Sequence, residues 1–156
     1  MPYKQDFSSF KLWTLRIPCC TAIGWLEPEY SYSHGAVKES FVEKLSSLLV
    51  DTWQPFTSWG SHDCGFCNPP KVPSPLRFKD HLIQLGKGEL CVPYESKIFV
   101  SPRSIVHYIS SHDYCPPPEY QEAVMQCPAM NSEAYFRALL KTPIKCYVSP
   151  KFTAFN

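Results

Sequence analysis

The sequence predicts an α+β fold in a single domain spanning residues 1–156, with a β-hairpin, about four helices and one metal-binding turn. Two apolar runs on either side of residues 94–96 have the pattern of hairpin strands. Apolar side chains recur at helical spacing in four other segments. Two cysteines and two histidines have spacings that suit one tetrahedral metal ion.

The N-terminal part of the chain contains the first predicted strand. Residues 12–17 place Trp13, Leu15 and Ile17 on one face, which indicates a strand. Residues 22–26 are compatible with a second strand or with a turn into a loop. Residues 27–35 contain Pro, Ser and Gly, so we expect a loop there.

Four helices are predicted, near residues 36–50, 102–112, 117–127 and 132–140. The first is the clearest because it carries one continuous apolar stripe. That stripe consists of Val37, Phe41, Leu45 and Leu48. The second helix has a face that we expect to point at the core, formed by Ile105, Tyr108, Ile109 and His112.

Local signals indicate where the later helices begin. Ser101 is a candidate N-cap, with Pro102 at the first helical position. The prolines at 116–118 stop this helix and start the next. Either Asn131 or Ser132 is expected to cap the last helix.

The remaining segments are predicted to be extended. Residues 68–75 contain four prolines and form a stiff connector, not a helix. Residues 89–92 and 97–100 form the two hairpin strands. Residues 144–148 alternate in hydrophobicity, so a terminal strand is expected there.

Composition sets limits on location and partners. With 44% hydrophobic and 19% charged residues the chain is globular, and a formal net charge of +1 gives no overall attraction to nucleic acid or membranes. No apolar run approaches the roughly 18 residues that span a bilayer. The first ten residues lack a signal-peptide core, so we expect a cytoplasmic protein with reduced thiols and no membrane partner.

The predicted metal ligands are Cys64, Cys67, His107 and His112. Thiolate and imidazole are the ligands that Zn²⁺ prefers, and structural zinc sites usually take all four from the protein. Gly65 allows the tight turn, here called the knuckle, that brings the two thiols together. The eight cysteines are scattered, so a metal role for this pair is favoured over a disulfide framework.

Two points leave the ligand set open. Residues five apart on a helix differ by about 140° in direction. His107 and His112 can therefore share one ion only if the helix loosens or tightens between them, and Ser110 and Ser111 are where this could happen. His62 is an alternative ligand, because His62, Cys64 and Cys67 could supply three ligands and leave an open position.

Two motifs resemble those of a family of small uncharacterised bacterial proteins. That family combines an H-x-C-x-x-C knuckle with a later HY(I/V)xxHxYxPP helix, and residues 53–67 and 100–114 with the following prolines are similar to it. Residues 23–26 also resemble its N-terminal segment. The resemblance implies a bacterial, intracellular, metal-binding domain without a known activity. The residues it implicates are His62, Cys64, Cys67, His107 and His112.

The favoured functional hypothesis is a structural-zinc domain that acts as a protein-interaction module. Its aromatic residues at 30–32 or 53–59 would contact a protein partner. The sequence does not determine the oligomeric state.

One alternative is a zinc-dependent hydrolase or deaminase-like enzyme with an open metal position at His62, Cys64 and Cys67. The H-x-E and P-C-x-x-C motifs of zinc deaminases and the H-E-x-x-H motif are absent. The base in such an enzyme would have to be Asp63, Glu89 or Glu95.

The other alternative is a nucleic-acid-binding domain. A mild basic cluster near the knuckle supports it, formed by Lys71, Arg77, Lys79 and Lys87. Nucleic acid is nevertheless an unlikely partner on sequence grounds, because tight phosphate binding favours a strongly basic domain.

Overall fold

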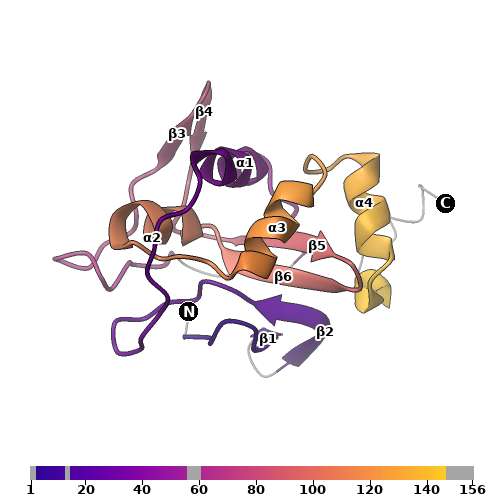
Figure 1. Ribbon diagram of the computed structural model, residues 1–156, viewed down its shortest axis with the longest axis horizontal. Helices are drawn as coiled ribbons and strands as arrows, with labels where there is room; N and C mark the ends of the chain where they lie inside the picture. The colour runs from indigo at the N-terminus through magenta and orange to yellow at the C-terminus, as the bar shows by residue number, and fades with distance from the viewer. Residues whose placement is uncertain (1–2, 13–14, 56–60, 147–156) are drawn as a thin grey trace.

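A four-stranded sheet lies at the centre of the computed structural model, which describes residues 3–12, 15–55 and 61–146 (Figure 1). Its strand order is β1-β2-β6-β5. The strands are β1 (Ser9–Leu12), β2 (Leu15–Ala22), β5 (Glu89–Tyr94) and β6 (Lys97–Pro102). With the helices described below, they confirm the predicted α+β fold class.

The N-terminal strands form a hairpin where one strand was expected. Leu12 of β1 pairs with Leu15 of antiparallel β2, so the single strand predicted over residues 12–17 is wrong. Trp13 lies outside the described residues. A short apolar run has the same pattern whether it continues straight or turns back, which explains the error. β2 then pairs in parallel with β6, with Cys20 opposite Ile98.

The β5–β6 hairpin confirms the second strand prediction and is longer than expected. Its turn contains Glu95 at φ 54°, and the pairing continues to Glu89 opposite Pro102. Ser101 and Pro102 therefore end a strand and do not start a helix. The local Ser-Pro signal is overridden because the Ser101 hydroxyl lies 2.9 Å from the buried Tyr120 hydroxyl.

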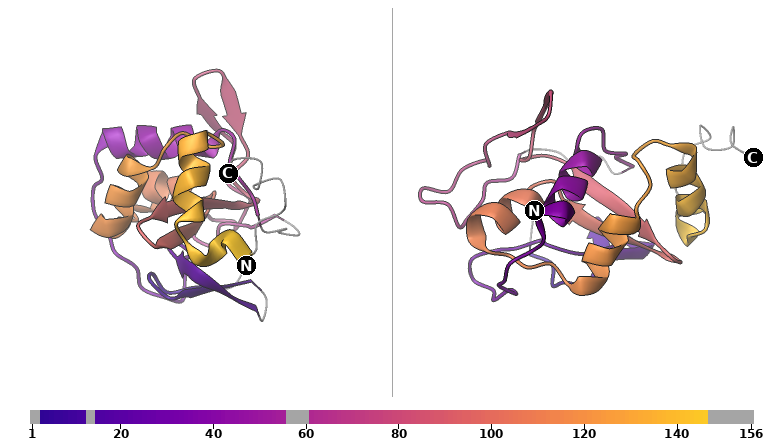
Figure 2. Two further views of the ribbon diagram at one scale, coloured as in Figure 1. Left: turned by 90° about the vertical axis from the view of Figure 1, so that its right-hand side faces the viewer. Right: turned by 45° about the horizontal axis from the view of Figure 1, so that its top comes forward.

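Four helices pack around the sheet, each slightly shorter than predicted. They are α1 (Glu39–Leu49), α2 (Ile105–His112), α3 (Pro118–Gln126) and α4 (Glu133–Leu140). Helices α1 and α3 contact each other on the same side of the β5–β6 hairpin (Figures 1 and 2). Ser132 caps α4, since its hydroxyl accepts a hydrogen bond from the Tyr135 backbone.

Two smaller elements differ from the sequence-based expectation. Pro143–Cys146 forms the 3-10 helix η1, so the terminal strand expected over residues 144–148 is wrong, and Val148 lies outside the described residues. Strands β3 (Leu76–Phe78) and β4 (His81–Ile83) form an unpredicted hairpin that projects from the body beside α1 (Figure 1).

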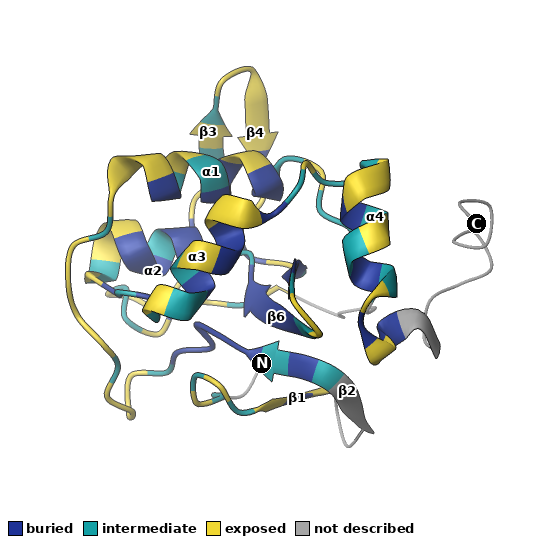
Figure 3. Ribbon diagram, turned by 45° about the vertical axis from the view of Figure 1, so that its right-hand side comes forward, coloured by how far each residue is buried: buried dark blue, intermediate teal, exposed yellow. Residues whose placement is uncertain are grey.

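One cluster of buried side chains lies between the sheet and the helices (Figure 3). It includes the stripe residues Phe41, Leu45 and Leu48 of α1, as the periodicity predicts. Ile105, Tyr108 and Ile109 of α2 are buried as well. Within the described part of the chain, no helix is long and apolar enough to cross a membrane.

Candidate metal centre

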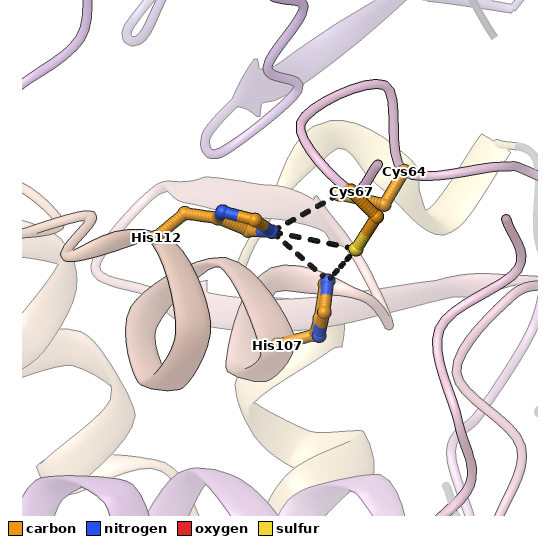
Figure 4. A group of neighbouring side chains, drawn as sticks. All are labelled: Cys64, Cys67, His107 and His112. Carbon is orange, nitrogen blue, oxygen red and sulfur yellow. Dashed lines mark hydrogen bonds between the residues drawn. The ribbon is translucent and has the colours of Figure 1, made fainter. Parts of the chain in front are cut away.

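Four side chains from two separate segments meet at one point (Figure 4). The sulfurs of Cys64 and Cys67 and the Nε2 atoms of His107 and His112 all lie within 4.8 Å of one another. The Cys64 sulfur is 3.3 Å from His112 Nε2, and the Cys67 sulfur is 3.5 Å from His107 Nε2. The two Nε2 atoms are 3.2 Å apart. This set could hold a metal ion.

The knuckle is shaped by backbone hydrogen bonds. The Cys64 N–H donates to the Lys71 carbonyl at 2.8 Å, and the Cys67 N–H donates to the Cys64 carbonyl at 3.3 Å. Burial raises the pKa of the Cys64 thiol, while the N–H groups of Phe66 and Cys67 donate to its sulfur and act in the opposite direction. Such N–H groups stabilise a thiolate, which is the form that binds metal.

Both histidines come from one α-helix. α2 continues as an α-helix through Ser110 and Ser111 to His112, so it contains no visible change at the two serines that were candidates for one. The two imidazole rings instead converge beside the helix, with centroids 5.0 Å apart. Burial, and then the neighbouring His112 and Lys71, lower the pKa of His107, which favours the neutral imidazole that ligates metals.

An aromatic cluster encloses one side of the site. Phe66 lies between the two cysteines in sequence and packs against Tyr32, Tyr108 and His112, with ring centroids 5.3, 6.0 and 5.3 Å away. The Tyr32 hydroxyl also donates to the His112 carbonyl at 2.9 Å. Tyr32 is therefore a half-buried support of the site, whereas Tyr30 is 51% exposed and stacks on Tyr3. Tyr32 has no ligand-type signal in the sequence, so only the structure reveals this role.

The other sequence-based candidates lie outside the group of four. Among the described residues, the metal group does not contain His62, whose backbone N–H donates to the Gly86 carbonyl at 2.7 Å. Asp63 and Glu95 are exposed. Glu89 is fully buried in β5, and neither of its carboxylate oxygens has a hydrogen-bond partner among the described residues. Burial raises the pKa of Glu89 to about 7.

The other cysteines with described side chains lie outside the group of four. All seven cysteines whose side chains the structure describes are free thiols. Cys20 and Cys127 are buried, as expected of small apolar residues, and Cys19 is half-buried. The side chain of Cys146 lies outside the described part of the chain.

Comparison with known families places the chain in one of them. The family described as a domain of unknown function, DUF7919, matches residues 2–125. The chain belongs to the DUF7919 family. All four residues of the metal group lie within the DUF7919 segment, whereas α4 lies beyond it. No curated protein and no solved structure matched this DUF7919 chain.

Proposed function

We propose that the protein is a structural-zinc domain that acts as a protein-interaction module. The observation that carries the proposal is the convergence of four protein ligand atoms within 4.8 Å of one another. A tetrahedral zinc ion with four protein ligands has no position left for water or substrate. The ion would fasten the knuckle to α2.

The spacing of the ligand atoms supports zinc. Zn–S bonds of about 2.3 Å and Zn–N bonds of about 2.0 Å place sulfur and nitrogen about 3.5 Å apart and two nitrogens about 3.3 Å apart. In the structure, three of the distances between a cysteine sulfur and a histidine Nε2 atom are 3.3, 3.5 and 3.7 Å, and the two Nε2 atoms are 3.2 Å apart. Two soft thiolates also disfavour Mg²⁺ and Ca²⁺, which take oxygen ligands. A reducing compartment, for which we propose the cytoplasm, keeps such thiols available.

The enzyme alternative receives less support from this geometry. A zinc hydrolase or deaminase needs an open coordination position and a nearby proton-transfer group. The candidate base Glu89 is enclosed in the sheet, and Asp63 and Glu95 do not belong to the metal group. A structural role instead fits a ligand set drawn from a loop and a helix, because binding the ion then adds directly to folding stability.

Cobalt substitution tests the proposal. Co²⁺ replacing the native ion should give the intense visible absorption of a tetrahedral site with two thiolates and two imidazoles. His107→Ala and His112→Ala should each weaken metal binding, while His62→Ala, the matched control, should retain one metal ion per chain by elemental analysis. Loss of the metal in His62→Ala with retention in His107→Ala would overturn the proposal and favour the open site.

A further inference from the structure

A basic arm extends from the metal centre. The arm comprises residues 71–87 and contains β3 and β4. Four of its residues are cationic, all of them exposed, and only Asp80 is acidic. The cationic residues are Lys71, Arg77, Lys79 and Lys87. Because the whole chain has a net charge of only +1, the rest of the protein is net acidic and the positive charge is concentrated here.

The base of the arm is attached to the knuckle on both sides. The Cys64 N–H donates to the Lys71 carbonyl at 2.8 Å, where the arm begins. The His62 N–H donates to the Gly86 carbonyl at 2.7 Å, where it returns. Gly86 lets the two ends approach, since a Cβ there would lie 2.3 Å from Val72 Cγ1. These hydrogen bonds tie the arm to the knuckle, so the proposed metal ion at Cys64 would also hold the base of the arm in place.

The outer face of the arm combines positive charge with apolar surface. Arg77 and Leu82 are paired across β3 and β4, so their side chains share one face. Leu82 is 58% exposed, and Val72 nearer the base is 43% exposed. Ile83, the next residue along β4, is on the opposite face and is buried, so it anchors the arm. This outer face is thus available to a partner that has both acidic and apolar side chains.

A hollow of about 280 Å³ separates the arm from α1. Its lining consists of Ser40, Glu43, Lys44, Ser47, Phe78 and Lys79. Lys44 and Lys79 contribute two cations to this lining, and Glu43 contributes one carboxylate, so its net charge is positive. The Ser40 hydroxyl adds a donor, whereas the Ser47 hydroxyl donates to the Lys44 carbonyl at 2.7 Å. Carboxylate side chains of a partner would find two cations and the Ser40 hydroxyl at this place.

We propose that the basic arm and this hollow are the docking surface for an acidic segment of a partner protein, with leucine-like side chains that cover Leu82. This inference rests on the proposed function, because the metal-bound knuckle holds the arm. Phosphate backbones require charge alone and gain nothing from exposed Leu82 and Val72. The apolar component therefore favours an acidic peptide over nucleic acid.

The test uses a defined probe, a fluorescein-labelled peptide of alternating glutamate pairs and single leucines, and measures its binding to the zinc-loaded protein by anisotropy. Arg77→Glu/Lys79→Glu should weaken binding about tenfold. The matched control Lys11→Glu/Lys141→Glu makes the same charge change at exposed lysines away from the arm and should leave binding nearly unchanged. Leu82→Ser should weaken binding of this peptide but not of one with serine in place of leucine.

Two results would overturn the inference. One is equal loss of binding in the arm variant and its control. The other is tighter binding of single-stranded or duplex DNA than of the peptide at the same salt concentration, which would make the arm a nucleic-acid contact. Zinc content is measured for every variant. If the protein contains one zinc per chain but peptide binding does not depend on the arm residues, only the docking surface is rejected. If the wild-type protein contains no zinc, the proposed function is rejected.

Discussion

The sulfur of Cys64 lies 3.3 Å from Nε2 of His112, although 48 positions separate the two residues in the chain. An ion held between them closes a long loop and joins the knuckle to the end of α2. Closing a loop of this length removes about 3 kcal/mol of conformational entropy from the unfolded chain. The stability of the fold should accordingly depend on the ion.

Replacement of the buried ligand tests this dependence. Cys64→Ser should abolish stoichiometric zinc and lower the free energy of unfolding by about 3 kcal/mol or more. Thermal unfolding and elemental analysis measure both effects. Cys115→Ser, which removes a half-buried free thiol outside the group of four, is the control and should retain zinc and nearly all of the stability. A Cys64→Ser protein that unfolds like wild type would contradict the structural role.

A second prediction concerns the buried carboxyl group of Glu89. Since burial raises its pKa from the ordinary 4.5 to about 7, the folded state binds a proton more tightly than the unfolded state does. Stability is therefore lost as pH rises between these values, and the cost reaches about 3 kcal/mol above pH 7. Glu89→Gln removes this cost because the amide stays neutral.

Urea denaturation of Glu89→Gln and wild type at two pH values provides the measurement. The variant should be more stable than wild type at pH 8 and nearly equal to it near pH 4. Because the two proteins are compared at the same pH, any effect of zinc loss at low pH cancels. Glu122→Gln, at an exposed position of α3, should show no such difference. A stability gain of the same size at both pH values would contradict a raised pKa at Glu89.

Gly24 provides a third prediction. It has φ +72°, and an added Cβ would lie 2.8 Å from Ile105 Cδ1. Left-handed backbone costs a non-glycine residue about 1–2 kcal/mol, and overpacking of a core adds about 1–3 kcal/mol. Gly24→Ala should lower the free energy of unfolding by the sum of these two costs, about 2–5 kcal/mol. Gly35→Ala, where the nearest atom is 3.4 Å away, is the control and should change stability little in chemical denaturation.

The buried hydroxyl pair of Ser101 and Tyr120 allows a fourth prediction. Their oxygens are 2.9 Å apart, so removing either one leaves the other without its partner. Ser101→Ala and Tyr120→Phe should each cost about 1–3 kcal/mol, and the double variant should cost less than the two single effects combined. A double-mutant cycle measured by urea denaturation checks the coupling. Strict additivity would mean that the pair does not interact.

Much of the site could be predicted because its signals are local. The spacing of Cys64 and Cys67 and that of His107 and His112 identify two ligand pairs, and the apolar stripe of α1 identifies a buried helix face. The sequence favoured the helix pair but left His62 as an alternative ligand, because excluding it depends on which segments meet in space. Convergence of the two imidazoles on one point depends on side-chain orientations that helical spacing alone does not specify.

Other parts of the fold depend on contacts that leave no local pattern. The parallel pairing of Cys20 with Ile98 joins strands that are far apart in the chain. Strands β3 and β4 have three residues each, which is too short for a periodic signal to appear. Ser101 carried a genuine capping signal, yet its buried contact with Tyr120 outweighs it.

The separation of the two ligand pairs also has a consequence for protein synthesis. The thiols precede their histidine partners by 40 to 48 residues. At about 5–20 residues per second, a ribosome needs roughly 2–10 s to add the missing imidazoles after the thiols. With the proposed metal binding, each nascent chain presents two cysteines before it can complete their coordination shell, and translation speed sets the earliest moment at which the ion can be fully enclosed.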